Sequence, residues 1–222
     1  MKTAAIRWEA LISTRYTWKR TLDSSLMNAS SFMSRWQLLW SVQTEFFGLV
    51  RRAFTTLDSH SLPLLYRTLV RPHLEYGNVV WGPTYRSDQD AIERVQRRAT
   101  KLVRPMRHLP YQDRLRALNL PSMYYRRMRG DMIMTYQILT GCLRVSVIDL
   151  LQRDTSERTW GHQLKLKKIR VNSHLRQTSF CCHIVEIWNS LPAEIVAAPN
   201  LNTFKNRLDK LWMNKRYTLR TN

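Results

Sequence analysis

Apolar residues recur at three- and four-residue steps along most of the chain after residue 45, which is the spacing of amphipathic helices. The clearest stretch is SDQDAIERVQRRATKLVRPM, residues 87–106, where one face is apolar and much of the rest is basic. Ser87 and Asp90 have the spacing of a capping box, and Pro105 is expected to end the helix or bend its last turn. The residues predicted to face inward are Ile92, Val95, Ala99, Leu102 and Met106.

A helix is also predicted to begin near Ser61, with Pro63 in its first turn, where a missing N–H is harmless. Pro72 lies inside the same apolar pattern, so the helix is expected to kink or restart there. Arg71 and Glu75 are four residues apart and are predicted to form an ion pair on this helix.

Helical periodicity continues through four later segments, residues 110–120, 122–141, 177–192 and 203–212. Gly141 is a C-terminal stop signal for the second of them, and Asn202 is the expected N-cap of the last. In that last helix Phe204, Leu208 and Leu211 are predicted to face inward.

The segment HQLKLKKIRV, residues 162–171, instead alternates apolar and basic residues, which is typical of a short strand. Leu164, Leu166 and Ile169 would form its inner face. The fold class is therefore predicted to be mainly α, a helical bundle followed by a small hairpin and C-terminal helices.

Positive charge is the main compositional feature. The 222 residues include 36 Lys and Arg against 16 Asp and Glu, a net charge of +20, while 44% hydrophobic residues are enough to bury a core. The excess is spread along the chain, whereas a disordered basic tail would concentrate it in one block. A polyanionic partner is expected, and nucleic acid is the leading candidate.

Three cysteines, Cys142, Cys181 and Cys182, are an odd number with one adjacent pair and do not form a disulfide framework. Arg7, Glu9 and Arg15 interrupt the N-terminal sequence before a secretory apolar region can form, and no later stretch approaches about 18 uncharged apolar residues. We expect an intracellular protein, nuclear or cytoplasmic, without a membrane span.

Motifs for catalysis are missing from the sequence. There is no Walker loop, Rossmann glycine pattern, HExxH or CxxC, and the six glycines leave little scope for a phosphate-binding loop. Cys181, Cys182 and His183 are consecutive and would point to different sides of a helix. The one close acidic pair, Asp88 and Asp90, is explained by helix capping. We therefore expect no catalytic residue, metal, cofactor or small-molecule substrate.

Basic residues are the candidates for binding the phosphate backbone of RNA, DNA or an RNA–DNA hybrid, because phosphate contacts release condensed counterions. Tyr111, Tyr124 and Tyr125 lie nearby in the sequence and could stack on exposed bases. The predicted nucleic-acid contacts are Arg94, Arg97, Arg98, Lys101, Arg104, Arg126, Arg127, Lys165, Lys167 and Lys168.

Several motifs in order resemble reverse transcriptases of LINE-type, jockey-like non-LTR retrotransposons, downstream of the catalytic palm. They are LLYRTLVRPHLEYGNVVWGP, DAIERVQRRATKLV, LPYQDRLRALNLPS, RRMRGDMIMTYQILTG, GHQLKLKK, IWNSLPAEIV and APNLNTFKNRLDKLW, within about residues 46–212. The resemblance implies the thumb and C-terminal extension of an RNA-directed DNA polymerase, which grip the template–primer duplex. The palm aspartates, the fingers and the endonuclease of that family have no counterpart here.

The resemblance also indicates how the chain divides. Residues 1–44 do not match the family, residues 45–142 would form a thumb-like helical domain, and residues 143–222 would form the extension. Trp160 before Gly161 departs from the family, which usually has a basic residue there. We therefore expect a non-catalytic fragment of a retrotransposon polymerase that retains a basic nucleic-acid surface.

Two alternatives remain open. Residues 110–140 have the helix, turn, helix order of a sequence-specific DNA-binding module. Base-reading residues lie at the start of the second helix of such a module, where this chain has Tyr124, Tyr125, Arg126 and Arg127. A strong preference for one duplex sequence would favour this alternative. The other is an inert helical interaction protein or pseudogene product, favoured if the basic residues are paired with acidic neighbours.

Overall fold

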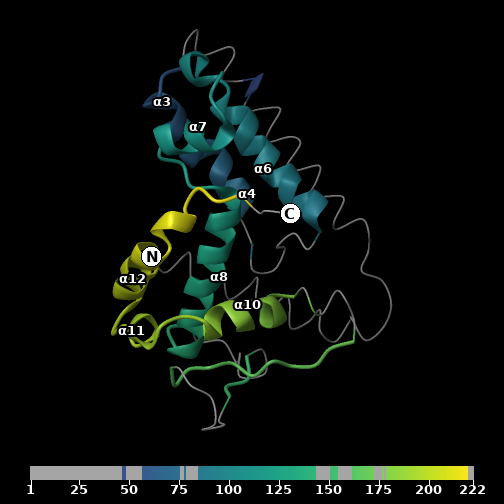
Figure 1. The fold of residues 1–222 in the computed structure, drawn as a ribbon, viewed down its shortest axis with the longest axis vertical. Helices are drawn as coiled ribbons and strands as arrows, with labels where there is room; N and C mark the ends of the chain where they lie inside the picture. The colour runs from purple at the N-terminus through teal and green to yellow at the C-terminus, as the bar shows by residue number, and fades with distance from the viewer. Residues whose placement is uncertain are drawn as a thin grey trace. The chain divides into compact units, whose positions relative to one another are not determined.

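The computed structural model describes residues 47–48, 57–75, 78, 85–143, 151–154, 162–172, 177 and 179–219. This part of the chain is mainly helical and contains no strand, which confirms the predicted mainly-α class (Figure 1). None of its helices is both long and apolar enough to cross a membrane. The predicted segment 1–44 lies outside the described residues.

The chain packs as two compact units, which are described separately below. The first unit contains the described residues up to 75, Ser87–Tyr124 and residues 217–219, and the second contains the described residues of Asn78–Arg86 and Tyr125–Arg216. These units cut the chain at other positions than residues 44 and 142, and the division expected from the resemblance stays a prediction.

In the first unit, Pro72 is accommodated without a break in the helical run. The helices α3 (Ser61–Leu65), η1 (Tyr66–Val70) and α4 (Arg71–Glu75) follow one another directly, and η1 is a π-helix. The Arg71 N–H accordingly bonds to the carbonyl of Tyr66, five residues earlier. Widening the turn before a proline relieves its clash with the preceding carbonyls, so the expected kink takes the form of a π-turn.

The most amphipathic helix of this unit, α6 (Arg86–Thr100), is followed by the short 3-10 turn η2 (Arg104–Met106) and by α7 (Tyr111–Ala117). The predicted capping box is wrong, because Ser87 is already the second helical residue and its hydroxyl donates to Asp88 at 3.3 Å. The helix ends four residues before Arg104, and Pro105 lies in η2.

The predicted apolar face of α6 is confirmed. Ile92, Val95 and Ala99 are buried, and Leu102 and Met106 pack partly buried against the same core. The other core residues of this unit come from the segment before α3, from α3 to α4, from the residue before η2, from α7 and the turn after it, and from the start of α8: Leu57, Leu62, Tyr66, Val70, Leu74, Val103, Tyr111, Leu115, Leu118, Leu120 and Met123.

The second unit is built on α8 (Met123–Leu139), whose first two residues belong to the first unit. The helix stops where predicted, because Gly141 follows with a φ of +71°, a left-handed conformation that glycine adopts easily. The remaining helices are α10 (Phe180–Asn189), α11 (Ala193–Val196), α12 (Leu201–Leu211) and the 3-10 turn η4 (Met213–Lys215).

Aromatic rings form the centre of the second unit, where α12 runs alongside α8 (Figure 1). The Tyr136 ring on α8 stacks on Phe204 of α12 with centroids 4.4 Å apart, and Trp188 of α10 lies 6.0 Å from the same Phe204. The Tyr136 hydroxyl donates to the carbonyl of Ala198 at 2.6 Å, which fixes the segment that leads into α12.

The predicted basic strand is reduced to one isolated antiparallel bridge between Arg153 and Leu166. Leu166 is buried as expected, but Ile169 is exposed, because the pairing does not extend far enough to keep the alternation in place. The backbone of Leu166 is hydrogen-bonded by a side chain on its other edge. The Asn189 side-chain amide accepts from the Leu166 N–H and donates to the Leu166 carbonyl, both at 2.9 Å.

The helix α12 differs from the prediction at both ends. Its N-cap is Asn200, whose side chain accepts from the Thr203 N–H at 2.8 Å, and Asn202 is an exposed residue inside the helix. Phe204 and Leu208 are buried as expected, but Leu211 is exposed and Trp212 takes its place, four residues after Leu208.

This difference gives a direct test of the cap. Replacing Asn200 with alanine removes the acceptor of an otherwise unpaired helical N–H and is expected to lower the free energy of unfolding by about 1 kcal/mol. Urea unfolding measures the change. Asn202→Ala is the matched control and should leave stability within about 0.5 kcal/mol of the original, as expected for an exposed side chain. Equal losses for the two variants would contradict the assignment of the cap.

Candidate nucleic-acid interface

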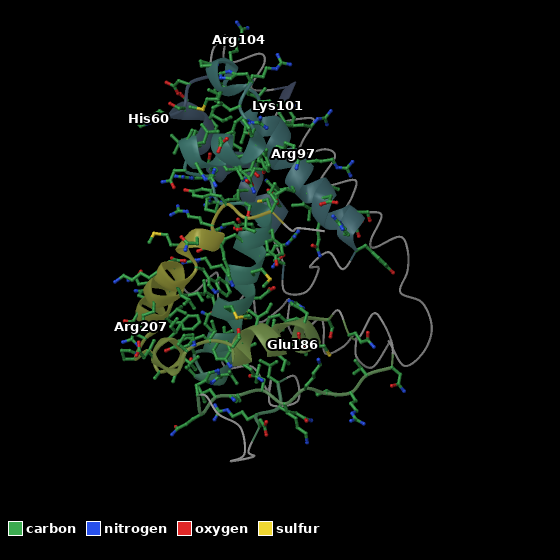
Figure 2. All side chains as sticks on the ribbon, viewed as in Figure 1. His60, Arg97, Lys101, Arg104, Glu186 and Arg207 are labelled. Atoms are coloured by element: carbon green, nitrogen blue, oxygen red, sulfur yellow. The ribbon has the colours of Figure 1, made fainter. Side chains whose placement is uncertain are left out.

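Exposed basic side chains follow one another along the second half of α6 and the turn after it. Within the first unit, Arg94, Arg97, Arg98 and Lys101 have spacings of three, one and three residues, so they share the side of the helix that faces away from the core. Figure 2 shows Arg97 and Lys101 on this stretch and Arg104 on η2. We call the exposed residues Arg94, Arg97, Arg98, Lys101, Arg104 and Arg107 the basic ridge.

No acidic residue interrupts this ridge. From Arg94 to Pro110 the sequence has six Arg and Lys residues and no Asp or Glu. Among the described residues, the side chains of Arg94, Arg98, Lys101 and Arg104 form no hydrogen bond or ion pair. Their charges are therefore available to an external anion.

The nearest carboxylate in the sequence, Glu93, is directed into the core. It is 8% exposed, and its carboxylate accepts the Tyr111 hydroxyl at 2.6 Å and the N–H groups of Met123 and Tyr124 at 3.4 and 3.2 Å. The two N–H groups belong to the first turn of α8, where a helix N-terminus favours negative charge. Glu93 thus compensates a helix end from inside the core.

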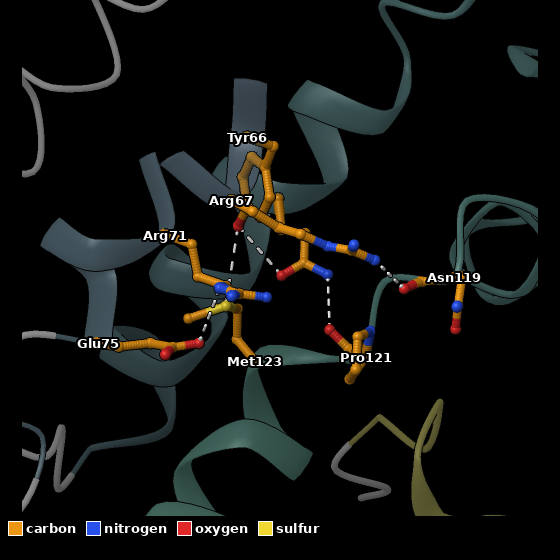
Figure 3. Close-up of polar contacts among 8 residues, drawn as sticks. Tyr66, Arg67, Arg71, Glu75, Asn119, Pro121 and Met123 are labelled. Atoms are coloured by element: carbon orange, nitrogen blue, oxygen red, sulfur yellow. Dashed lines mark hydrogen bonds and ion pairs between the residues drawn. The ribbon is translucent and has the colours of Figure 1, made fainter. Parts of the chain in front are cut away.

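Buried polar contacts hold α6 in this orientation (Figure 3). The Tyr66 hydroxyl donates to Gln96 Oε1 at 3.1 Å, and Gln96 Nε2 donates to the carbonyl of Pro121 at 2.9 Å. In the same unit Arg67 donates to the carbonyl of Asn119 at 2.8 Å. Because Gln96 is 1% exposed and tied on both sides, the helix cannot turn its ridge inward without breaking buried hydrogen bonds.

The predicted ion pair near this network is confirmed. Arg71 Nε and Glu75 Oε1 are 3.7 Å apart across one turn of α4 (Figure 3). His73 is exposed and does not form a pair with Glu75 in the structure.

The expectation that nearby tyrosines stack on bases is wrong for two of the three. Tyr111 is buried, with the guanidinium groups of Arg97 and Arg114 at 4.9 and 5.5 Å from its ring centroid. Tyr125 is buried and its hydroxyl donates to Asp209 at 2.9 Å in the second unit. Burial raises the pKa of Tyr125 to about 12, with the Asp209 carboxylate adding to the shift. Of the three, Tyr124 alone is half-buried and not fully buried.

One arginine beside the ridge is internal. Arg114 is 3% exposed and donates to Thr100 Oγ1 at 3.1 Å and to the carbonyl of Leu109 at 2.5 Å. Burial lowers the pKa of Arg114, and the neighbouring Arg97 contributes to that shift. Arg114 therefore adds positive charge beneath the ridge while it joins α7 to the end of α6.

The other five predicted contacts belong to the second unit. Arg126 and Arg127 are half-buried on α8, and Lys165 is half-buried beside the bridge. Lys167 is exposed, whereas Lys168 forms an ion pair with Glu186 of α10. The structure thus brings together Arg94, Arg97, Arg98, Lys101 and Arg104, and their role as phosphate contacts stays a prediction.

Two features of the ridge were missing from the sequence interpretation. The first is Arg107, which lies after Pro105 and outside the helical pattern. Its position in a run of residues without Asp or Glu would have been enough to predict it as a further phosphate contact. The inward direction of Glu93 had no local signal, because its donors are Tyr111, Met123 and Tyr124, 18 to 31 residues away.

Metal-binding geometry does not occur in the described part of the chain, which holds no group of three or more His, Cys, Asp or Glu side chains able to share an ion. Cys181 and Cys182 are half-buried on α10, and the next residue, His183, bonds to Asp131.

Comparisons of the chain with known protein families, with curated proteins and with solved structures find no match.

Proposed function

We propose that this chain is a non-catalytic fragment related to the reverse transcriptases of LINE-type retrotransposons, and that it binds nucleic acid through the phosphate backbone at the basic ridge. The single observation that carries the binding proposal is the run of exposed cations from Arg94 to Arg107 with no acidic residue between them. The order of the sequence motifs supports the relationship.

The ridge suits a phosphate backbone for an electrostatic reason. Each Lys or Arg that neutralises a phosphate releases a condensed counterion, which favours binding at low salt. The buried face of α6 keeps the positive side chains outside the core, and the Glu93 carboxylate is buried within it. Burial of Tyr111 leaves few rings for bases near the ridge, which favours backbone contact over base stacking.

The helix-turn-helix alternative receives no comparable support. In DNA-binding modules of that kind, the start of the second helix reads the bases. Here the first N–H groups of α8 are bound to Glu93, and Tyr125 is buried. The proposal likewise includes no polymerase activity, so primer extension with a divalent metal would contradict it.

Neutralising the ridge tests the proposal. The triple variant Arg94→Gln, Arg98→Gln, Lys101→Gln removes three exposed charges and is expected to weaken binding to a short duplex on the order of 100-fold at about 0.1 M salt. The slope of log affinity against log salt should become shallower by about 2–3. Fluorescence anisotropy at several salt concentrations measures both quantities.

The control variant removes the same charge from the second unit. Lys205→Gln, Lys210→Gln, Lys215→Gln changes residues on α12 and η4 and should leave affinity within a few fold. Circular dichroism checks that both triple variants remain helical. Equal losses of affinity for the two variants would show that net charge, and not the basic ridge, determines binding. Binding that is absent at about 50 mM salt, or that does not depend on salt, would refute the proposal.

A further inference from the structure

A histidine and a buried carboxylate join two helices of the second unit. His183 on α10 and Asp131 on α8 face each other with His183 Nε2 3.0 Å from Asp131 Oδ2. The other ring nitrogen, Nδ1, lies 3.1 Å from the carbonyl oxygen of Ser179. Asp131 is 5% exposed, and its second oxygen accepts from the Asn78 amide at 3.3 Å.

Both ring nitrogens therefore face oxygen atoms. A neutral imidazole has only one N–H, so it can donate to the Ser179 carbonyl or to Asp131 but not to both. With an ionised Asp131, one nitrogen lone pair would then point at an acceptor oxygen. Two states satisfy every group: an imidazolium beside a carboxylate, or a neutral imidazole beside a protonated carboxyl. These two states hold the same number of protons.

We propose that His183 and Asp131 share one proton and form a pH-dependent latch between α8 and α10, which weakens when that proton leaves. Either partner can carry the shared proton, and the latch is the same in both cases. Loss of the proton breaks one hydrogen bond in either case and leaves a net negative pair in place of a neutral one.

Some surroundings of the pair favour its protonated form, and others favour loss of the proton. Burial raises the pKa of Asp131, although His183 and Arg127, one turn earlier on α8, act in the opposite direction. On α10 the edge of the Phe180 ring lies against the imidazole, and Glu186, one turn after His183, is engaged by Lys168. The positive charge of Arg127 favours the ionised form of this carboxylate.

The sign of the pH dependence follows from the proton count. In the unfolded chain a histidine loses its proton near pH 6.5, whereas the folded pair keeps its proton to higher pH. Above about pH 6.5 the folded state therefore binds more protons than the unfolded state, and stability falls as the pH rises. Below about pH 6.5 the stabilising effect is fully present, until the carboxylate of the unfolded chain begins to protonate near pH 4.

The variant Asp131→Asn removes the shared proton but keeps the hydrogen bonds of the pair. Its amide nitrogen can donate to a neutral His183, and its oxygen can still accept from Asn78, so every group is satisfied without the shared proton. We expect the melting temperature of the original chain to fall relative to this variant by on the order of 5 °C between pH 6 and pH 8.5. The full chain is used, with melting followed by circular dichroism.

Another titrating histidine in this unit needs a control. His162 is buried and its Nε2 donates to the Trp188 carbonyl at 3.1 Å. Burial lowers the pKa of His162, so its effect on stability appears at acid pH and is common to both chains. The difference between the two melting curves isolates the latch.

Nuclear magnetic resonance of the original chain gives a second readout that does not need the variant to fold. The ring nitrogens of His183 and the carboxyl carbon of Asp131 should report one shared proton at pH 6, and its loss at a higher pH than for a free histidine. A neutral imidazole beside an ionised carboxylate at pH 6 would overturn the latch, and so would parallel melting profiles for the two chains. Neither result bears on nucleic-acid binding, because the basic ridge belongs to the other unit.

Discussion

Replacing Trp188 with alanine is expected to lower the free energy of unfolding of the second unit by about 3–5 kcal/mol, among the largest effects of any single change in this chain. Trp188 is fully buried on α10 and contacts the ring of Phe204, which in turn stacks on Tyr136. Its removal leaves a cavity in the middle of these rings, and surrounding side chains close such cavities only in part.

Trp188 also carries a side-chain hydrogen bond that the alanine variant would lose. Its indole Nε1–H donates to the carbonyl of Leu164 at 2.7 Å. The variant Trp188→Phe keeps most of the ring volume and removes only the donor, so it should cost roughly 1–3 kcal/mol. Urea unfolding followed by circular dichroism compares the three chains. A cost of less than about 1 kcal/mol for Trp188→Ala would contradict the central place of this residue.

Replacing Glu93 with alanine is the second change with a large expected effect, a loss of about 3–5 kcal/mol in the first unit. The substitution leaves three donors without their acceptor, namely the buried Tyr111 hydroxyl, the buried Met123 N–H and the part-buried Tyr124 N–H. Each buried donor left unpaired costs about 1–3 kcal/mol. The loss of a negative charge at the start of α8 adds to this.

The same residue provides an independent spectroscopic check. Burial raises the pKa of Tyr111 far above its usual value, and the Glu93 carboxylate adds to the shift. In Glu93→Ala the Tyr111 hydroxyl should therefore ionise at lower pH than in the original chain, which ultraviolet titration can follow. Glu194→Ala is the matched control, because it removes an exposed carboxylate from α11 and should leave stability within about 0.5 kcal/mol. Similar losses for the two variants would show that net charge, and not the buried network, is responsible.

The sequence predicts the helices well because their signal is local. Ile92, Val95 and Ala99 repeat with the period of a helix and are buried, and Gly141 ends α8 where the pattern stops. Helix ends are less predictable, since Asn200 and Asn202 are both good capping residues and only tertiary packing decides where the chain enters α12. The inward position at the end of α12 is equally ambiguous in the sequence, because Leu211 and Trp212 are both apolar. In the structure Trp212 is buried and Leu211 is exposed.

Long-range polar contacts could not be predicted in the same way. A glutamate on an amphipathic basic helix is expected in solvent, and Glu93 is buried only because Tyr111 and the start of α8 supply three donors to it. His183 and Asp131 are 52 residues apart, so no periodic pattern relates them. The exposed cations were easier to predict, because a basic side chain opposite an apolar stripe faces water.

The C-terminal residues of the described chain have a consequence for the order of folding. Ser122 donates its hydroxyl to the carbonyl of Thr218 at 2.7 Å, and Tyr217 and Leu219 pack against the core of the first unit. The chain leaves this unit after Tyr124 and comes back to it at Tyr217, so residues made after the whole of Tyr125–Arg216 complete a core begun far earlier. Contacts of such long sequence separation are slow to form. The unit that carries the basic ridge is therefore expected to reach its full stability late, after most of the other unit has been made.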